Sequence, residues 1–286
     1  MLLFFDIDGT IFDDQRHLPA SVKPAMEAAR RNGHQLVINT GRTLCNLDRR
    51  LDGFPLDGWI MGCGTRLIWH GETLRSMEYD PETSQRLRRL FQELEMPVVY
   101  ECDTAMYFDP DNSGHPSVAH FREWAEKRGI CRDITEDDPE FRAVKMFGFA
   151  KRSRIAVMKK ATAEAGLPYT AINRWPEGWE IVPTGYSKGK GIDILRKRLG
   201  VKKADCFAVD SRCCCGQSRT HTEKEDESRV LLDEAFSYKL KFSHILFLLS
   251  LLAGLRLSMS QEASVYLRLL QTPEMQVLHP GHMRGK

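Results

Sequence analysis

The sequence lacks a strong net charge and a long apolar run near its N-terminus. Its 41 Lys and Arg residues nearly balance 39 Asp and Glu residues, so the formal charge of +2 gives no whole-molecule attraction to nucleic acid or to an anionic membrane. Asp6 and Asp8 interrupt the apolar N-terminal run before a signal-peptide core of useful length can form. We therefore expect a cytoplasmic protein with reduced thiols and no nucleic-acid partner.

The sequence also lacks zinc-ligand spacing. Three of its 8 cysteines, Cys213, Cys214 and Cys215, are adjacent, but no second Cys or His pair lies nearby at the spacing of a zinc site. A metal role for this triplet is therefore not favoured. The other cysteines are scattered singly, as buried cysteines usually are: Cys45, Cys63, Cys102, Cys131 and Cys206.

The N-terminal part alternates strand and helix patterns. The apolar residues 2–5 predict a buried strand that ends at Asp6. A helix should follow, with Ser21 as its N-cap and Gly33 as its stop. Residues 36–38 predict a second strand, which completes a βαβ unit and hence a parallel sheet with a right-handed crossover.

The pattern changes at Asp80. Asp80 and Pro81 open a predicted helix, and further helices are expected at 117–128 and 153–165. Short strands joined by short turns indicate an α+β domain with an antiparallel sheet inserted at residues 80–183. The expected strands of this insertion are 98–100, 105–108, 145–149, 169–173 and 179–182. A helix at 190–199 and a buried strand at 206–209 then return to the first, parallel-sheet domain, which comprises residues 1–79 and 184–210.

Polar side chains follow the predicted parallel strands, where such folds bind ligands. Asp6 and Asp8 lie two residues apart on one side of an extended segment. Two carboxylates this close repel each other unless a cation or a shared proton lies between them, so the pair suits an oxygen-binding metal such as Mg²⁺. Alternatively, the segment is only an Asp-Gly turn.

Two further segments strengthen the first interpretation. Thr40, Gly41 and Arg42 follow the second strand and offer a hydroxyl, an unhindered backbone N–H and a cation, all suited to phosphate oxygens. Lys188 lies in a glycine-rich segment and offers a positioned ammonium group. Each signal alone is weak, but all of them occur in this order, each in a loop after a strand.

In these segments the sequence resembles the haloacid dehalogenase superfamily, in particular its capped, Cof-type phosphatase branch. The resemblance covers residues 1–210 and rests on Phe5-Asp6-Ile7-Asp8-Gly9-Thr10, on Thr40-Gly41-Arg42, and on Glu180-Ile181-Val182-Pro183 followed by Ser187-Lys188-Gly189-Lys190-Gly191. It implies a Rossmann-like hydrolase core, with residues 80–183 as the cap over the active site.

The resemblance also implies a role for each site residue. Asp6 would attack phosphorus and form an aspartyl-phosphate, and Asp8 would act as the general acid and base. Thr40, Gly41 and Lys188 would bind the phosphoryl group. The resemblance further implies that Asp6, the backbone carbonyl of Asp8, and Asp210 hold Mg²⁺.

The sequence departs from the family pattern after Asp210. The fourth family motif carries a second acid a few residues after its first, whereas Arg212 and the cysteine triplet stand here instead. The closing βα pattern is also missing from 211–286, a divergent tail that is dense in charge at 219–229. Three explanations are open: a reading-frame or splice change near Ser211, a tail selected for membrane or partner binding, or a phosphatase with a rewired metal site.

The uncharged apolar stretch from Ser243 to Leu255 is shorter than the ~20 residues that a membrane-spanning helix needs, so a buried or interfacial helix is favoured.

We expect a Mg²⁺-dependent phosphatase that acts on small phosphorylated metabolites, namely sugar phosphates or phosphorylated cofactors. The alternative is a non-catalytic protein that binds a phosphorylated ligand or a partner. The cap should select the substrate, with His115, Arg174 and Trp175 as candidate contacts. The oligomeric state does not follow from the sequence.

Overall fold

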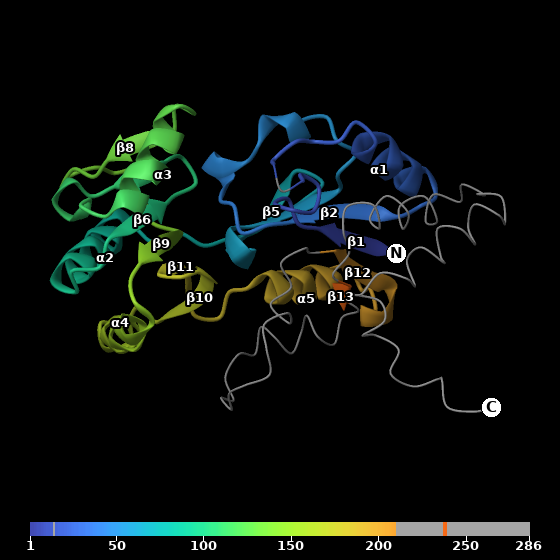
Figure 1. Cartoon of the computed structure of the whole chain (residues 1–286). Coiled ribbons are helices and arrows are strands. Elements are labelled where there is room, and N and C mark those ends of the chain that lie inside the picture. Colours follow the sequence, from blue (N-terminus) through green and yellow to red (C-terminus); the bar gives the residue numbers. More distant parts are fainter. Residues whose placement is uncertain (14, 210–236, 239–286) are drawn as a thin grey trace, which may run out of the picture.

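The computed structural model describes residues 1–13, 15–209 and 237–238. The sequence-based expectations for Asp210, for Arg212 with the cysteine triplet and for the stretch from Ser243 to Leu255 lie outside this part of the chain. Figure 1 shows two bodies, a blue sheet flanked by helices and a green and yellow layer beside it, joined by the chain on either side of the insertion.

The first sheet has seven strands in the order β13-β12-β1-β2-β3-β4-β5. The pairs from β13 to β3 are parallel, and β3, β4 and β5 form an antiparallel extension. The strands are β1 Leu2–Phe5, β2 Gln35–Asn39, β3 Gly58–Met61, β4 Arg66–Trp69, β5 Glu72–Ser76, β12 Cys206–Val209 and β13 Ser237–Tyr238.

Helices cover both faces of this sheet. Helix α1 (Val22–Arg31) packs Met26 and its other apolar residues against Leu3 and Phe5. Helix α5 (Lys188–Arg198) packs Leu195 on the opposite face, against the alternate residues of β1. Because successive side chains of a strand point to opposite faces, the two helices enclose β1 completely (Figure 1).

The inserted body contains a six-stranded sheet in the order β10-β11-β9-β6-β7-β8. All of its pairs are antiparallel except β7 with β8. Its strands are β6 Val98–Glu101, β7 Met106–Phe108, β8 Cys131–Asp133, β9 Lys145–Phe149, β10 Tyr169–Trp175 and β11 Gly178–Pro183, and its helices are α2 Pro81–Glu93, α3 Pro116–Glu126 and α4 Arg152–Glu164. The short 3-10 helices in the described part of the chain are η1 Leu44–Asn46, η2 Arg49–Leu51, η3 Gly62–Gly64, η4 Pro110–Asn112 and η5 Lys203–Asp205.

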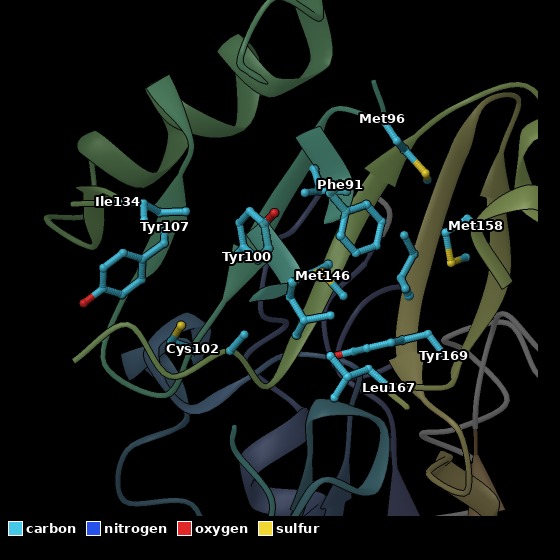
Figure 2. Packing of buried hydrophobic residues seen from close by; sticks show 14 of the residues in the cluster. Phe91, Met96, Tyr100, Cys102, Tyr107, Ile134, Met146, Met158, Leu167 and Tyr169 are labelled. Carbon is cyan, nitrogen blue, oxygen red and sulfur yellow. The ribbon is translucent and has the colours of Figure 1, made fainter. Parts of the chain in front are cut away.

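The two faces of the inserted sheet differ. Helices α2 and α4 bury one face in an aromatic and methionine-rich cluster that includes Phe91, Tyr100 and Met158 (Figure 2). The other face carries Phe147 and Phe149 and is partly covered by α3, and the first body's Cys45 packs against this cluster. The second face is therefore the one that contacts the first body.

The expected fold class is confirmed, and most expected elements lie within about two residues of their observed bounds. Ser21 occupies the N-cap position of α1 without a capping hydrogen bond from its side chain. Five of the described strands were not expected: β3, β4, β5, β8 and β13. The domain boundaries at 80 and 183 stay a prediction. In the part that the structure describes, no helix is both long and apolar enough to cross a membrane.

Candidate active site

Polar residues gather where the parallel strands of the first sheet end. Phe5 lies in register with Ile38 on β2 and with Val209 on β12. Asp6, the next residue of the chain, donates its backbone N–H to the carbonyl of Val209 at 3.0 Å. The chain after β1 and the chain after β2 therefore leave the sheet at the same edge, as the sequence predicted.

The Asp6 carboxylate is buried and paired with Lys188. The Lys188 Nζ lies 2.9 Å from Asp6 Oδ1, and the two side chains are only 14% and 7% exposed. Lys188 is the first residue of α5 and not part of a turn, because Ser187 caps this helix by accepting a hydrogen bond from the Lys190 N–H at 3.1 Å. The helix start fixes the ammonium group beside Asp6.

Thr40 and Gly41 form the loop after β2. The Thr40 hydroxyl oxygen accepts a hydrogen bond from the Arg42 backbone N–H at 3.1 Å, and the backbone N–H of Thr40 donates to the Ile60 carbonyl at 2.8 Å. A Cβ atom at Gly41 would lie 2.7 Å from Glu180 Oε1, so a carboxylate from the inserted body excludes any side chain at this position. This loop is thus held from both bodies of the structure.

Arg42 differs from its expected role. Its Nε and Nη2 donate to both carboxylate oxygens of Asp8, at 2.9 and 2.6 Å, and Nη1 donates to the Asn46 carbonyl at 3.4 Å. The guanidinium group therefore orients Asp8, whereas the sequence suggested a direct contact between this cation and a phosphate. A bidentate pair of this kind fixes both the direction and the plane of the carboxylate.

A buried cluster of four charged residues lies on the inserted sheet, and the sequence did not reveal it. Lys145 Nζ lies 2.7 Å from Glu180 and 3.3 Å from Glu101, and Arg174 Nε donates to Glu180 at 2.7 Å. Lys145, Glu101 and Glu180 are each less than 5% exposed as residues. Two cations and two carboxylates balance, which is the condition under which buried charges are tolerated.

The opposite charges of the cluster shift the pKa values of their neighbours. Burial alone would raise the pKa of Glu180, but the charges of Lys145 and Arg174 outweigh it and hold that pKa well below its usual range. Burial likewise opposes the ionised form of Lys145, yet the two glutamates raise its pKa. For Glu101, burial dominates and raises the pKa. Lys145 therefore stabilises the ionised form of Glu180 more than that of Glu101, in agreement with its shorter distance to Glu180.

Two hydrogen bonds join this cluster to the first body. The Cys63 thiol donates to Glu180 Oε1 at 3.2 Å, and the Thr43 hydroxyl donates to Glu101 Oε2 at 3.3 Å. Burial and the neighbouring Glu180 raise the pKa of Cys63 to about 12, so the thiol keeps its proton at neutral pH. The sequence does contain a signal for this cluster. Three strands that are otherwise mostly apolar each include one charged residue: Glu101, Lys145 or Glu180.

The remaining candidates for substrate contact have structural partners. His115 caps α3 by accepting the Ser117 N–H and stacks on Phe149 with ring centroids 5.0 Å apart. Arg174 belongs to the buried cluster. Trp175 stacks on Phe147 at 4.8 Å and is 40% exposed. Of the three, Trp175 presents the most open surface for a ligand.

The oxygen donors at the sheet edge fit a hard cation. Asp6 supplies a buried carboxylate, and Asn39, the last residue of β2, carries a buried Oδ1 atom that has no hydrogen-bond partner. A cation or an ordered water satisfies such an atom. Among the described residues, no three His, Cys, Asp or Glu side chains come together as a metal cluster. The expected third ligand, Asp210, lies outside them.

Comparison with known proteins agrees with this geometry. The model of the haloacid dehalogenase-like hydrolase family matches residues 3–209. The Bacillus subtilis protein YkrA is 26% identical over 210 residues, which cover 72% of this chain and 77% of YkrA. The HMP-PP phosphatase of Cronobacter sakazakii is 23% identical over 211 residues, which cover 71% and 75%.

The solved structures that are similar to this one include a subclass IIB sugar phosphatase of the same superfamily, BT4131. It superposes with a TM-score of 0.57 at 20% identity and covers 73% of this chain and 79% of its own. This likeness establishes the fold, with a capped Rossmann-like core. The chain therefore belongs to the haloacid dehalogenase-like hydrolase family and is a hydrolase of the phosphatase type.

Proposed function

We propose that the chain hydrolyses small phosphomonoesters with Mg²⁺, through an aspartyl-phosphate on Asp6. The observation that carries this proposal is the buried Asp6 carboxylate beside Lys188, at the sheet edge that also holds the Thr40–Gly41 loop. Phosphoryl transfer needs a positioned nucleophile and neutralised charge more than covalent machinery. Lys188 offsets the charge that Asp6 and an incoming phosphate would otherwise concentrate at this edge.

In the first step, a carboxylate oxygen of Asp6 forms a bond to phosphorus while the bond from phosphorus to the leaving oxygen breaks. Asp8 gives its proton to that leaving oxygen. In the second step, water attacks phosphorus, its proton passes to Asp8, and the bond between Asp6 and phosphorus breaks to release inorganic phosphate. The Asp8–Arg42 ion pair represents the ionised form of Asp8, so Asp8 must loosen its contact with Arg42 to carry a proton.

The Thr40 hydroxyl and the Gly41 N–H would bind the phosphoryl oxygens. Because the Thr40 oxygen already accepts the Arg42 N–H, its hydroxyl hydrogen can point toward a phosphate. Asp6, the Asp8 carbonyl and Asp210 would hold Mg²⁺, which when bound supplies a positive charge for the phosphate oxygens. The names of the relatives, an HMP-PP phosphatase and a sugar phosphatase, support a small phosphorylated metabolite as substrate.

The test is hydrolysis of an aryl phosphate by the full chain, titrated with Mg²⁺, followed by acid quench of the enzyme with labelled substrate. We expect Mg²⁺-dependent turnover and a label on Asp6 that hydroxylamine removes, as an acyl phosphate requires. Hydroxylamine-stable label, or turnover that persists in excess chelator, would contradict the proposal. If labelled phosphate binds without any turnover, the second candidate holds: a non-catalytic protein that keeps the phosphate site.

A further inference from the structure

The helix η3 holds the backbone on both sides of Gly41. The backbone N–H of Gly62 donates to the Arg42 carbonyl at 2.8 Å. The backbone N–H of Cys63 donates to the Thr40 carbonyl at 3.1 Å. Because this carbonyl and the Gly41 N–H share one planar trans peptide, the hydrogen bond fixes the direction of the Gly41 N–H, which points the opposite way. The position of η3 therefore determines where Gly41 aims its N–H.

The backbone of η3 has an uncommon conformation. Gly62, Cys63 and Gly64 have φ angles of 56°, 57° and 87° in succession. Glycine adopts such angles freely, but at Cys63 the left-handed conformation costs free energy, because a Cβ atom then approaches the following carbonyl oxygen. A strained residue of this kind persists only where its surroundings hold it in place.

The surroundings that hold Cys63 come from the inserted body. Its thiol donates to Glu180 Oε1 at 3.2 Å, and the two cations of the buried cluster fix that carboxylate. A second contact lies at Thr43, whose hydroxyl donates to Glu101 Oε2 at 3.3 Å. All four residues are buried, so water does not compete for these hydrogen bonds. The inserted sheet thus holds one end of the segment 40–43 directly and the other end through η3.

We propose that Glu101 and Glu180 are positioning residues for phosphate binding, although both belong to the inserted body. This inference rests on the proposed function, because it takes the Gly41 N–H as a donor to the phosphoryl oxygens. The two glutamates act through Thr43 and Cys63 and not on the phosphate itself. The inserted body therefore contributes to the affinity for the phosphoryl group, which every substrate shares, in addition to any selection among leaving groups.

The test is equilibrium dialysis of labelled inorganic phosphate against the full chain with Mg²⁺, which needs no turnover. Thr43→Val and Cys63→Ala each remove one donor, whereas Thr43→Ser and Cys63→Ser each keep a hydroxyl that can donate in its place. Both changes at position 63 retain a Cβ atom, so the backbone strain is the same in the two. We expect the first pair to weaken phosphate binding by about five-fold or more, and the serine variants to stay within about two-fold of the native chain.

Thr162→Val is the matched control for a buried threonine. The Thr162 hydroxyl donates to carbonyls within α4, those of Met158 and Lys159, at 3.0 and 3.1 Å. Urea unfolding of every variant measures the loss of stability, which the control should share, whereas phosphate binding by the control should not change. Unchanged phosphate binding in Thr43→Val and Cys63→Ala overturns the inference, as does an equal loss in the control or a native chain that binds no phosphate.

Hydrolysis of phenyl phosphate separates this inference from the proposed function. We expect KM to rise by about five-fold in Thr43→Val and Cys63→Ala with kcat within about two-fold, because a contact that binds the phosphoryl group throughout the reaction affects KM alone. Phosphate binding that depends on these two residues in a chain without turnover supports the inference and contradicts the proposed function. Turnover with the same KM and the same phosphate affinity in every variant supports the proposed function and overturns the inference.

Discussion

Asp6 and Asp8 have different surroundings although they are two residues apart. Asp6 contacts an ammonium group at the start of a helix, and Asp8 is held at both oxygens by Arg42. Lys188 contacts one carboxylate oxygen of Asp6, whereas a bidentate pair with Arg42 fixes the orientation of Asp8. The two acids are thereby suited to different chemical roles.

Asparagine substitutions should separate these roles. An amide at position 6 cannot form an acyl phosphate, so we expect Asp6→Asn to lower kcat by at least about a thousand-fold. Asp8→Asn should retain a burst of nitrophenol from nitrophenyl phosphate, because this leaving group needs no proton, and then turn over slowly. Rapid-quench assays measure both. A full steady-state rate in Asp6→Asn, purified free of host phosphatases, would disprove the mechanism.

Asp48 should contribute to the pH dependence of stability. The Arg50 guanidinium and its backbone N–H lower the pKa of Asp48 to about 2, from 3.8. A lowered folded-state pKa stabilises the fold above pH 4, and this contribution is lost as the pH falls toward 2. With Arg50 half exposed, we expect Asp48→Asn to lower the free energy of unfolding by about 1 kcal/mol at pH 6 and by less at pH 3.

Urea unfolding of the native chain and of Asp48→Asn at the two pH values provides the measurement. Asp52→Asn serves as the control, since Asp52 is exposed and forms no ion pair among the described residues. A difference between Asp48→Asn and the native chain that grows as the pH falls would show that Arg50 does not stabilise the ionised carboxylate.

At the scale of elements, strand β11 connects the inserted sheet to the phosphate loop. Glu180 on β11 contacts Cys63 at η3 and lies where a side chain at Gly41 would be. The carboxylate cannot easily move away, because Lys145 and Arg174 hold it. This contact makes the close approach of the two bodies depend on the absence of a Cβ atom at one position.

A double-mutant cycle tests that contact. Gly41→Ala should lower the free energy of unfolding by about 1–3 kcal/mol, because the new methyl group meets a carboxylate that is fixed in place. Glu180→Ala should also destabilise, because it removes a carboxylate that Lys145 and Arg174 both contact and leaves the cluster with excess positive charge. Combined, the two changes should cost less than their sum, since the second removes the atom that clashes with the first. Strict additivity in chemical unfolding would refute the proposed contact.

The sequence predicted strands best where both faces are buried. β1, β2, β9 and β12 are nearly continuous apolar runs, which marks them regardless of context. β5 reads Glu-Thr-Leu-Arg-Ser and is half exposed at the sheet edge, and β3 begins with Gly58, so neither has a clear period. Their strand conformation follows from pairing with β4, which no local pattern encodes.

The residues of the candidate site likewise fall into those that the sequence predicted and those that it did not. Asp6, Thr40 and Lys188 were predictable because each follows or precedes a regular element at a known offset. The ion pairs Asp8–Arg42 and Lys145–Glu180 were not, since they join residues that lie far apart in the chain and depend on how β1 pairs with β2 and how β9 pairs with β11. A charged residue within an apolar strand, such as Glu180, signals a buried partner but does not identify it.

For the whole molecule, the proposed site residues Asp6, Thr40 and Lys188 lie outside the inserted body. Replacing residues 80–183 with a short Gly-Ser linker should therefore leave measurable hydrolysis of phenyl phosphate but abolish discrimination among sugar phosphates. Circular dichroism checks that the shortened chain folds, and kcat/KM over a substrate panel measures selectivity. A folded variant with an unchanged profile would show that the inserted body does not select the substrate.

The Gly41–Glu180 contact also restricts the order in which substitutions can accumulate during evolution. A change from glycine at position 41 is tolerated only in a chain whose residue 180 has already become shorter, and a shortened residue 180 removes one counter-charge from both Lys145 and Arg174. Viable substitutions at these sites should therefore arise in a fixed order and in linked sets. In an alignment of the lineage, positions 41, 145, 174 and 180 should covary as one group, although they come from different loops and strands.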